Sequence, residues 1–244
     1  MTAPLTVACF KWTPPHGYRS TFTAVHVRTL RSMVARHYVD PYRFVCITDD
    51  RKGLENVETI PMWSDYADVP SPHGGGNPSC YRRLKIFDPA IEAILGRRFV
   101  VIDLDTVITG DLRPLWNRPE DFVIWGETDP RSFYNGSMML MSAGARAHVW
   151  STFDPYNKDP RQRSPYLAHR AGRFGSDQGW ISHVLGPGQA MWGKKDGVYS
   201  YRVHIAKQYG NTLPENCRVV FWHGKVDPWT YEAQQIPWVR RFYC

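Results

Sequence analysis

Apolar runs and helix-like spacings alternate along the first half of the chain. Residues 5–10 and 43–48 are apolar runs typical of strands, and the second ends in acids. Between them, Val25, Leu30 and Met33 recur at roughly helical spacing, with Ser20 or Thr21 as the expected cap. Strand, helix and strand in this order predict a parallel βαβ unit. Further strands are expected at 56–61, 99–102, 122–125, 137–141 and 219–222, and helices at 80–93, with a break at Asp88-Pro89, and from 176.

Four consecutive apolar residues, Phe99 to Ile102, are followed at once by Asp103 and Asp105. A run without polar alternation suits a strand that is buried on both faces. In an extended chain, side chains two residues apart point the same way, so the two acids are expected to share a face. Buried carboxylates repel each other unless a cation or a proton lies between them. At the carboxyl end of a central strand, we expect that cation to be a divalent metal.

Composition predicts a soluble globular protein and excludes several other classes. Its 244 residues suit one large α/β domain, and no linker or repeat divides them. The formal charge of +7 and the pI near 9.2 favour polyanionic partners such as nucleotides or nucleic acid. Five scattered cysteines without a CxxC pair indicate neither a zinc site nor a disulfide framework. The sequence has no recognisable signal peptide or membrane-spanning run, which predicts a cytoplasmic protein.

Two stretches are rich in proline and are expected to be irregular. The first, residues 64–79, contains Gly74-Gly75-Gly76 without a following Gly-Lys-Ser/Thr, which excludes a P-loop and favours a loop over a pocket. The second, residues 154–173, is either a solvated basic loop or a binding loop for an anionic acceptor. Its basic residues are Lys158, Arg161, Arg163, His169, Arg170 and Arg173.

Three kinds of site compete for Asp103 and Asp105. An EF-hand needs an oxygen ligand at its fifth position and Gly at its sixth, where this chain has Val107 and Ile108. The same run also fits the DxDx(T/V) motif of haloacid-dehalogenase-like phosphatases, in which the first acid, here Asp103, is the nucleophile. That family carries its motif on the first strand, whereas here it lies about a hundred residues into the chain. The third kind of site is that of a nucleotide-sugar glycosyltransferase.

The order of motifs resembles GT-A glycosyltransferases, in particular retaining enzymes of family 8 such as glycogenin and bacterial galactosyltransferases. The resemblance implies an α/β, Rossmann-like GT-A fold with a mixed, mainly parallel sheet flanked by helices. It implies one domain over residues 1–244, with a nucleotide-binding half at 1–112 and a sugar and acceptor half at 113–244. The matching motifs are Tyr81-Arg82-Arg83-Leu84, Asp103-Leu104-Asp105, Asn135-Gly136-Ser137, Asp177-Gln178, His223-Gly224 and Pro228-Trp229.

The resemblance further implies a metal-dependent transferase that uses a nucleotide-sugar donor, with uracil as the expected base, and that retains the anomeric configuration. Asp103, Asp105 and His223 would hold Mn²⁺ or Mg²⁺, because carboxylates are hard oxygen ligands and imidazole favours Mn²⁺. Asp177, with Gln178 beside it, would be catalytic. The nucleotide and diphosphate are assigned to Phe10, Lys11, Trp12, Thr48, Asp49, Arg83, Lys85, Leu104 and Lys225, and the sugar and acceptor to Glu127, Asn135, Gly136 and Trp229.

The last motif departs from the family pattern His-x-x-Gly-x-x-Lys-Pro-Trp. Here Gly224 follows His223 directly and Asp227 stands before the Pro-Trp pair, so Lys225 becomes the candidate for the phosphate contact. The basic charge suggests an anionic acceptor, either a surface glycan or lipid precursor or a hydroxymethylated base in phage-type DNA. Two alternatives stay open, a phosphatase that uses Asp103 and a sugar-nucleotide-binding module without turnover.

Overall fold

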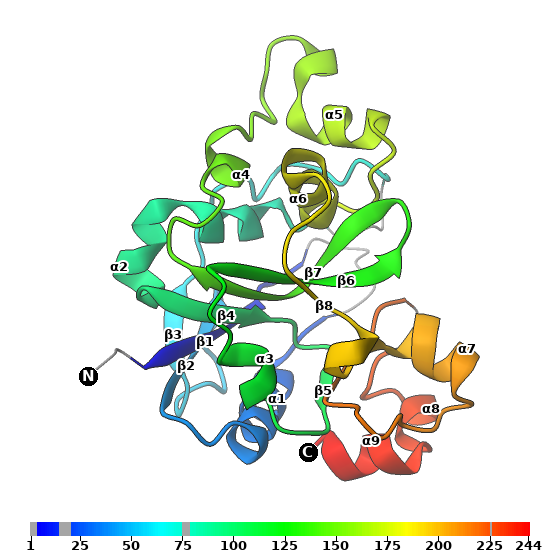
Figure 1. The fold of residues 1–244 in the computed structure, drawn as a ribbon. Helices are drawn as coiled ribbons and strands as arrows, with labels where there is room; N and C mark the ends of the chain where they lie inside the picture. Colours follow the sequence, from blue (N-terminus) through cyan, green and yellow to red (C-terminus); the bar gives the residue numbers. More distant parts are fainter. Residues whose placement is uncertain (1–3, 15–20, 75–78, 225) are drawn as a thin grey trace.

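Seven strands form the central sheet of the computed structural model, which describes residues 4–14, 21–74, 79–224 and 226–244 (Figure 1). In spatial order the strands are β3 (Glu58–Pro61), β2 (Tyr42–Thr48), β1 (Leu5–Lys11), β4 (Arg98–Ile102), β7 (Ser132–Ser142), β6 (Phe122–Asp129) and β8 (Met191–Trp192). β1 pairs in parallel with β2 and β4, β2 with β3, and β6 with β8, whereas β7 runs antiparallel to β4 and β6. The predicted single domain with a mixed, mainly parallel sheet is therefore confirmed.

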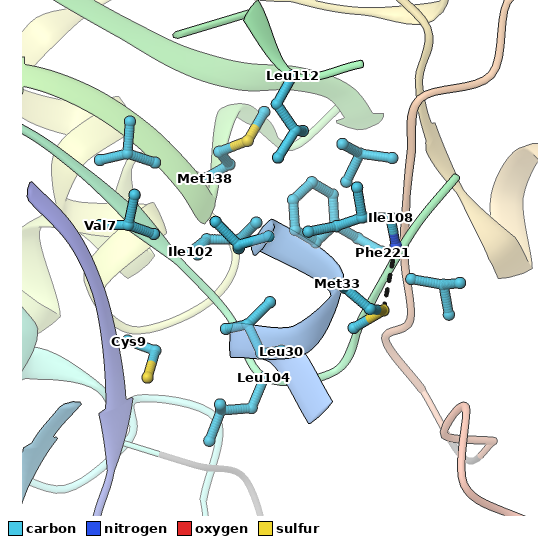
Figure 2. Packing of buried hydrophobic residues seen from close by; sticks show 14 of the residues in the cluster. Val7, Cys9, Leu30, Met33, Ile102, Leu104, Ile108, Leu112, Met138 and Phe221 are labelled. Atoms are coloured by element: carbon cyan, nitrogen blue, oxygen red, sulfur yellow. Dashed lines mark hydrogen bonds between the residues drawn. The ribbon is translucent and has the colours of Figure 1, made fainter. Parts of the chain in front are cut away.

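Both faces of the sheet are buried, as the apolar run in β4 predicts. Val100 and Ile102 belong to one apolar cluster, whereas Phe99 and Val101 belong to a second cluster on the opposite face. This division follows from the two-residue period of a strand, because successive side chains point to opposite sides. Figure 2 shows the first cluster, in which Leu30 of α1 (Ala24–His37) packs with Ile102. These four side chains of β4 are fully buried.

Helices cover both faces of the sheet (Figure 1). The predicted first helix is present as α1, but its N-cap is Thr23 and not Ser20 or Thr21, because the Thr23 N–H donates to Nδ1 of His26 in the first turn at 2.9 Å. No helix in the described part of the chain is long and apolar enough to cross a bilayer. The other helices are α2 (Glu92–Leu95), α3 (Arg113–Trp116), α4 (His148–Ser151), α5 (Ser164–Arg170), α6 (Asp177–Leu185), α7 (Ala206–Gln208), α8 (Tyr231–Gln234) and α9 (Pro237–Phe242).

A second, three-stranded sheet carries the end of the chain back to the acidic motif. β10 (Val219–Phe221) is the predicted last strand, and it pairs antiparallel with β5 (Thr106–Ile108) and parallel with β9 (Val198–Ser200). The N–H of Ile108 also meets the sulfur of Met33 in α1 at 3.5 Å (Figure 2). Just beyond β10, the N–H of Trp222 donates to the carbonyl of Asp105 at 2.8 Å. This sheet therefore brings His223 to the acids from more than a hundred residues away.

Two predicted elements differ from the structure. The expected helix at 80–93 consists of 3-10 turns at Tyr81–Phe87 and Pro89–Ile91 followed by the short α2, with the predicted break at Asp88, whose side chain accepts from the Ala90 N–H. The stretch 154–173 is only partly irregular, because it contains a 3-10 turn at Pro160–Gln162 and the helix α5. Proline in the first turn of α5 is compatible with a helix, since the first N–H groups have no partner within the helix.

Candidate active site

A cavity of about 220 Å³ lies at the carboxyl end of β4. Part of its wall is a bulge in β7, because Ile124 of β6 pairs with Met139 while Trp125 pairs with Asn135, which leaves residues 136–138 without partners on β6. The first turn of α6 and the residue after Trp222 complete the wall. Eight predicted site residues line this cavity together: Arg83, Asp103, Asp105, Asn135, Gly136, Asp177, Gln178 and His223.

Arg83 connects two of the motifs through ion pairs, of which the pair with Asp177 is buried and the pair with Asp103 is partly exposed. Its guanidinium lies 3.1 Å from Asp103 and 3.6 Å from Asp177, and it donates to the carbonyl of Gly136 in the bulge. Burial alone lowers the pKa of Arg83, but the charges of Asp103 and Asp177 outweigh it and raise that pKa above the ordinary value. The guanidinium is therefore a permanent positive charge fixed between two acids.

Asp177 is the first residue of α6 and is buried in the wall of the cavity. Burial raises its pKa above the ordinary value, Arg83 acts in the opposite direction, and the negative charge of Asp103 adds to the rise. Within the described chain, its Oδ2 atom has no hydrogen-bond donor. The preceding residue, Ser176, accepts a hydrogen bond from the Cys80 N–H at 2.9 Å, which fixes the start of α6 beside the turn that carries Arg83.

Gly136 makes room for the buried pair. A Cβ atom at this position would lie 3.2 Å from Oδ2 of Asp177 and 3.8 Å from both terminal nitrogens of Arg83. Because the pair cannot retreat without losing its geometry, Gly136→Ala is expected to lower the free energy of unfolding by about 1–3 kcal/mol. Urea unfolding measures this loss, and wild-type stability in the variant would show that the bulge, and not the pair, yields to the methyl group.

The metal ligands predicted from the sequence are only partly assembled. Asp103 and Asp105 both line the cavity, as expected for two acids that share a face. The strand ends at Ile102, however, so the alternation of side chains along a strand is not the reason that both acids face the cavity. Nε2 of His223 lies 2.7 Å from the Ser200 hydroxyl, and Nδ1 lies 3.3 Å from Arg202. Both ring nitrogens are thus engaged, and across the described residues no three His, Cys, Asp or Glu side chains form a metal-binding group. The two carboxylates fit a hard divalent cation, whereas the imidazole nitrogens have protein partners in this structure, so the metal role of His223 stays a prediction.

Comparison with protein-family models and with curated proteins finds no match to the sequence. Solved structures do match. The galactosyltransferase LgtC, in complex with donor and acceptor sugar analogs, aligns over 98% of this chain and 94% of its own, at 13% identity and a TM-score of 0.62. The chain has the GT-A glycosyltransferase fold. The apo glycosyltransferase GlyE of Streptococcus pneumoniae TIGR4 aligns over 94% and 57% (12% identity, TM-score 0.59), and apo mouse xyloside xylosyltransferase 1 over 91% and 98% (11%, 0.54).

In this GT-A fold, several predicted nucleotide-binding residues lie where β1 and β2 end, outside the lining of the cavity. Lys11 contacts the carbonyl of Asp50 at 2.9 Å and its carboxylate at 3.1 Å, and the hydroxyl of Thr48 bonds to the same carbonyl. Asp49 accepts from the N–H of Thr13 at 3.0 Å. Neighbouring parallel strands end at one edge of a sheet, so these groups form a polar rim beside β4.

The predicted aromatic residues of β1 stand against the turn that carries Arg83. The ring of Phe10 lies 5.7 Å from the guanidinium carbon of Arg83, and Trp12 lies 5.3 Å from that of Arg82. Phe10 also meets Trp63 edge to face at 5.6 Å. Phe10 therefore connects the end of β1 to the cation of the cavity, whereas Trp12 contacts the neighbouring Arg82.

Three predicted residues have other surroundings. Lys85 pairs with Asp65 at 2.7 Å and does not line the cavity, and the Leu104 side chain belongs to the buried apolar core. Trp229 stacks on His26 at 4.1 Å, at the start of α1. The structure gives these three residues the contacts described, and their predicted ligand contacts stay predictions. Lys225 and the side chain of Glu127 lie outside the described part of the chain, so their predicted roles stay predictions.

Several residues of the site had no prediction. Cys80 and Ser176 line the cavity, and each directly precedes a predicted motif, so adjacency was the available signal. Burial raises the pKa of Cys80 to about 12, which keeps it a neutral thiol. Ser200 and Arg202 hold His223, and the sequence gives no sign of them because the contact depends on the pairing of β9 with β10.

Proposed function

We propose that the protein is a metal-dependent glycosyltransferase that transfers a sugar from a UDP-sugar to a hydroxyl acceptor with retention of configuration. The observation that carries the proposal is the convergence of five separated motifs, in the family 8 order, on one cavity of a GT-A fold. These motifs contribute Arg83, Asp103, Gly136, Asp177 and His223. In a parallel sheet, the carboxyl edge of the strands is the usual place for a nucleotide.

The charges of the cavity suit a donor diphosphate. Asp103 and Asp105 would hold Mn²⁺ or Mg²⁺, and the cation, when bound, neutralises the charge that develops on the departing nucleotide diphosphate. Arg83 adds a second positive charge, fixed at 3.1 Å from Asp103. Its water-excluded position makes that charge more effective than one in bulk solvent. The aromatic and polar rim at the ends of β1 and β2 would receive the base and ribose.

Asp177 is the group we assign to the anomeric carbon. Its carboxylate is buried, faces the cavity and lies 3.6 Å from Arg83, which keeps it from rotating away. A fixed negative charge stabilises an oxocarbenium-like transition state and can shield or attack one face of the sugar, which supports retention. Gln178 lies beside it, with its amide 3.4 Å from the carbonyl of Phe174.

Removal of divalent metal is expected to abolish turnover of the donor. Treatment with EDTA should stop release of UDP from a panel of UDP-sugars, and added Mn²⁺ should restore it, because the diphosphate is then again neutralised. Calorimetric titration with UDP should show binding that depends on Mn²⁺ in the wild type and not in Asp105→Asn. Asp111→Asn is the matched control, since Asp111 is an acid paired with Arg113 outside the cavity. UDP binding of equal strength with and without metal would overturn metal dependence. UDP binding without hydrolysis of any nucleotide sugar would leave only a non-catalytic binding module, and the absence of both would overturn the proposal.

The geometry of the site does not support the phosphatase alternative. A nucleophilic Asp103 needs a carboxylate free to attack phosphorus, whereas Arg83 occupies it with an ion pair at 3.1 Å. In haloacid-dehalogenase-like phosphatases the Asp-x-Asp motif follows the first strand, whereas in this chain it follows β4, the fourth strand. Hydrolysis of a generic phosphoester, lost in Asp103→Asn, would reverse this judgement.

A further inference from the structure

A second cavity, of about 270 Å³, adjoins the first one. Ser71 lines both cavities, and the two are also connected by a pair of histidines. His73, from the wall of the first cavity, meets His169, from the wall of the second, edge to face at 5.3 Å. The walls of the second cavity are the loop at 69–72 and the segment at 155–169, which belong to the two proline-rich stretches of the sequence. Neither predicted strand ends nor the GT-A motifs contribute to it.

The lining of the second cavity combines apolar ring faces with the guanidinium of Arg163. Its prolines are Pro70, Pro72, Pro155, Pro160 and Pro165. Tyr166 lies among them and is 43% exposed, so its ring face is open to a ligand. The Nε of Arg163 donates to the carbonyl of Asn157 at 3.1 Å, which orients the guanidinium. Among the residues that the structure describes, no carboxylate pairs with its terminal nitrogens.

The two walls are held together by side chains outside the cavity lining. The hydroxyl of Tyr156 bonds to Asp68, and the ring of Tyr66 meets Phe153 edge to face at 4.7 Å. The hydroxyl of Ser164 accepts from the N–H of Asp154 at 2.7 Å, which closes the turn before α5. The cavity is therefore formed by the folded chain and does not depend on a ligand to shape it.

We propose that this second cavity binds the acceptor, and that the acceptor is a sugar carrying a carboxylate or a phosphate. This inference rests on the proposed transferase function, since it names the acceptor of that reaction. Proline and tyrosine rings present flat C–H and π faces that pack on a sugar ring, and a guanidinium matches a carboxylate or phosphate with two parallel hydrogen bonds. The shared Ser71 places the acceptor next to the donor site.

The size of the cavity selects a sugar over DNA. Its volume of about 270 Å³ is at the lower limit of ordinary ligand pockets, roughly 300–1,000 Å³, and suits one or two sugar rings. A DNA duplex needs a broad basic groove that follows the phosphate backbone. Here the ring faces are enclosed by prolines, and Arg163 stands at one point of the wall.

The test separates the ring faces from the charge. Binding of methyl β-D-glucuronide, glucose 6-phosphate and methyl β-D-glucoside is measured by NMR titration on the full chain. Arg163→Gln is expected to weaken both anionic sugars at least tenfold and to leave the neutral glucoside unchanged, because it removes only the charged contact. Tyr166→Ala should weaken all three sugars. Arg161→Gln, a matched change of charge on the same segment outside the cavity, should alter none of them.

The same measurements can overturn the inference. Equal binding of the anionic sugars to wild type and Arg163→Gln, no sugar binding at millimolar concentration, or tight binding of a short DNA duplex that Arg163→Gln weakens would each exclude an anionic-sugar site. The comparison of glucuronide with glucose 6-phosphate shows which anion the site prefers. Mn²⁺-dependent UDP binding, measured on the same variants, reports separately on the proposed function, so the acceptor site can fail while the transferase proposal stands.

Discussion

Replacing Arg83 by Met is expected to lower the free energy of unfolding by about 3–5 kcal/mol at neutral pH. The substitution fills most of the volume of the arginine stem but removes the guanidinium that lies 3.1 Å from Asp103 and 3.6 Å from Asp177. The buried Asp177 and the partly exposed Asp103 then remain close together without a cation. Urea unfolding in metal-free buffer measures the loss, since a bound divalent ion would substitute for the missing charge.

The loss of unfolding free energy in Arg83→Met should depend on pH, and the titration of Asp177 determines whether it grows or shrinks as the pH rises. Burial raises the pKa of Asp177 above the ordinary value of 3.8, and Arg83 opposes that rise, so Arg83→Met should raise the pKa further. A carboxyl group with a higher pKa in the folded state loses stability as the pH rises from its unfolded-state pKa to its folded-state pKa. The destabilisation should therefore be complete above the raised pKa and should shrink as the pH falls toward 3.8.

Arg43→Met is the matched control, because Arg43 pairs with Glu58 on the surface, where the two side chains are 35% and 50% exposed. Exposed pairs contribute about 0–1 kcal/mol, so this variant should lose little. Similar losses in both variants, or a loss in Arg83→Met that does not change with pH, would show that the buried charges are not the cause.

Local patterns predicted the parts of the fold that depend on local physics. The apolar run of β4 predicted a strand buried on both faces, and the runs of β1 and β2 predicted a parallel pair; all are confirmed. The period of two in a strand is present in the sequence itself, so no distant contact is needed to recognise it. The short helix α5 escaped prediction because its seven residues are too few to show a helical period.

The site was predicted as a set of residues, but not as a set of contacts. The two acids were predicted to need a divalent cation, and the positive charge that the structure places beside Asp103 is Arg83, a residue assigned from the sequence to the diphosphate. Likewise, His223 reaches the cavity as predicted, but Ser200 and Arg202 occupy its ring nitrogens. These pairings join segments 20 or more residues apart, and a sequence pattern carries no information on which partner folds against which.

The same long-range pairings define how the cavity could change when a donor binds. Arg83 satisfies Asp103 in the structure, and a diphosphate with its metal would compete for both groups. Because the guanidinium also pairs with Asp177, a shift of Arg83 toward phosphate would loosen its hold on that carboxylate. The acid assigned to the sugar and the acid assigned to the metal are therefore coupled through a single side chain.

Asp177→Asn is expected to change activity and stability in opposite directions. Turnover of the donor should fall about 10²–10³-fold, because the substitution removes a fixed charge aimed at the reacting carbon while keeping the shape of the side chain. The free energy of unfolding at neutral pH should rise, because the raised pKa of Asp177 shows that its charged form is unfavourable in the folded protein. Asp103 remains to balance Arg83 at 3.1 Å, so the guanidinium is not left alone.

Two measurements check this pair of effects on one variant. UDP release under saturating donor and Mn²⁺ gives kcat, and urea unfolding at neutral pH gives stability, with Asp111→Asn as an acid outside the cavity that should change neither. UDP affinity should stay within a few-fold of wild type, since Asp177 is assigned to the sugar and not to the diphosphate. Wild-type kcat in Asp177→Asn would remove the residue from the reaction, whereas a loss of stability would mean that its charge is needed by Arg83 for folding. A gain in stability together with a large loss in kcat is the result expected if the buried carboxylate of Asp177 destabilises the fold but is needed for the reaction.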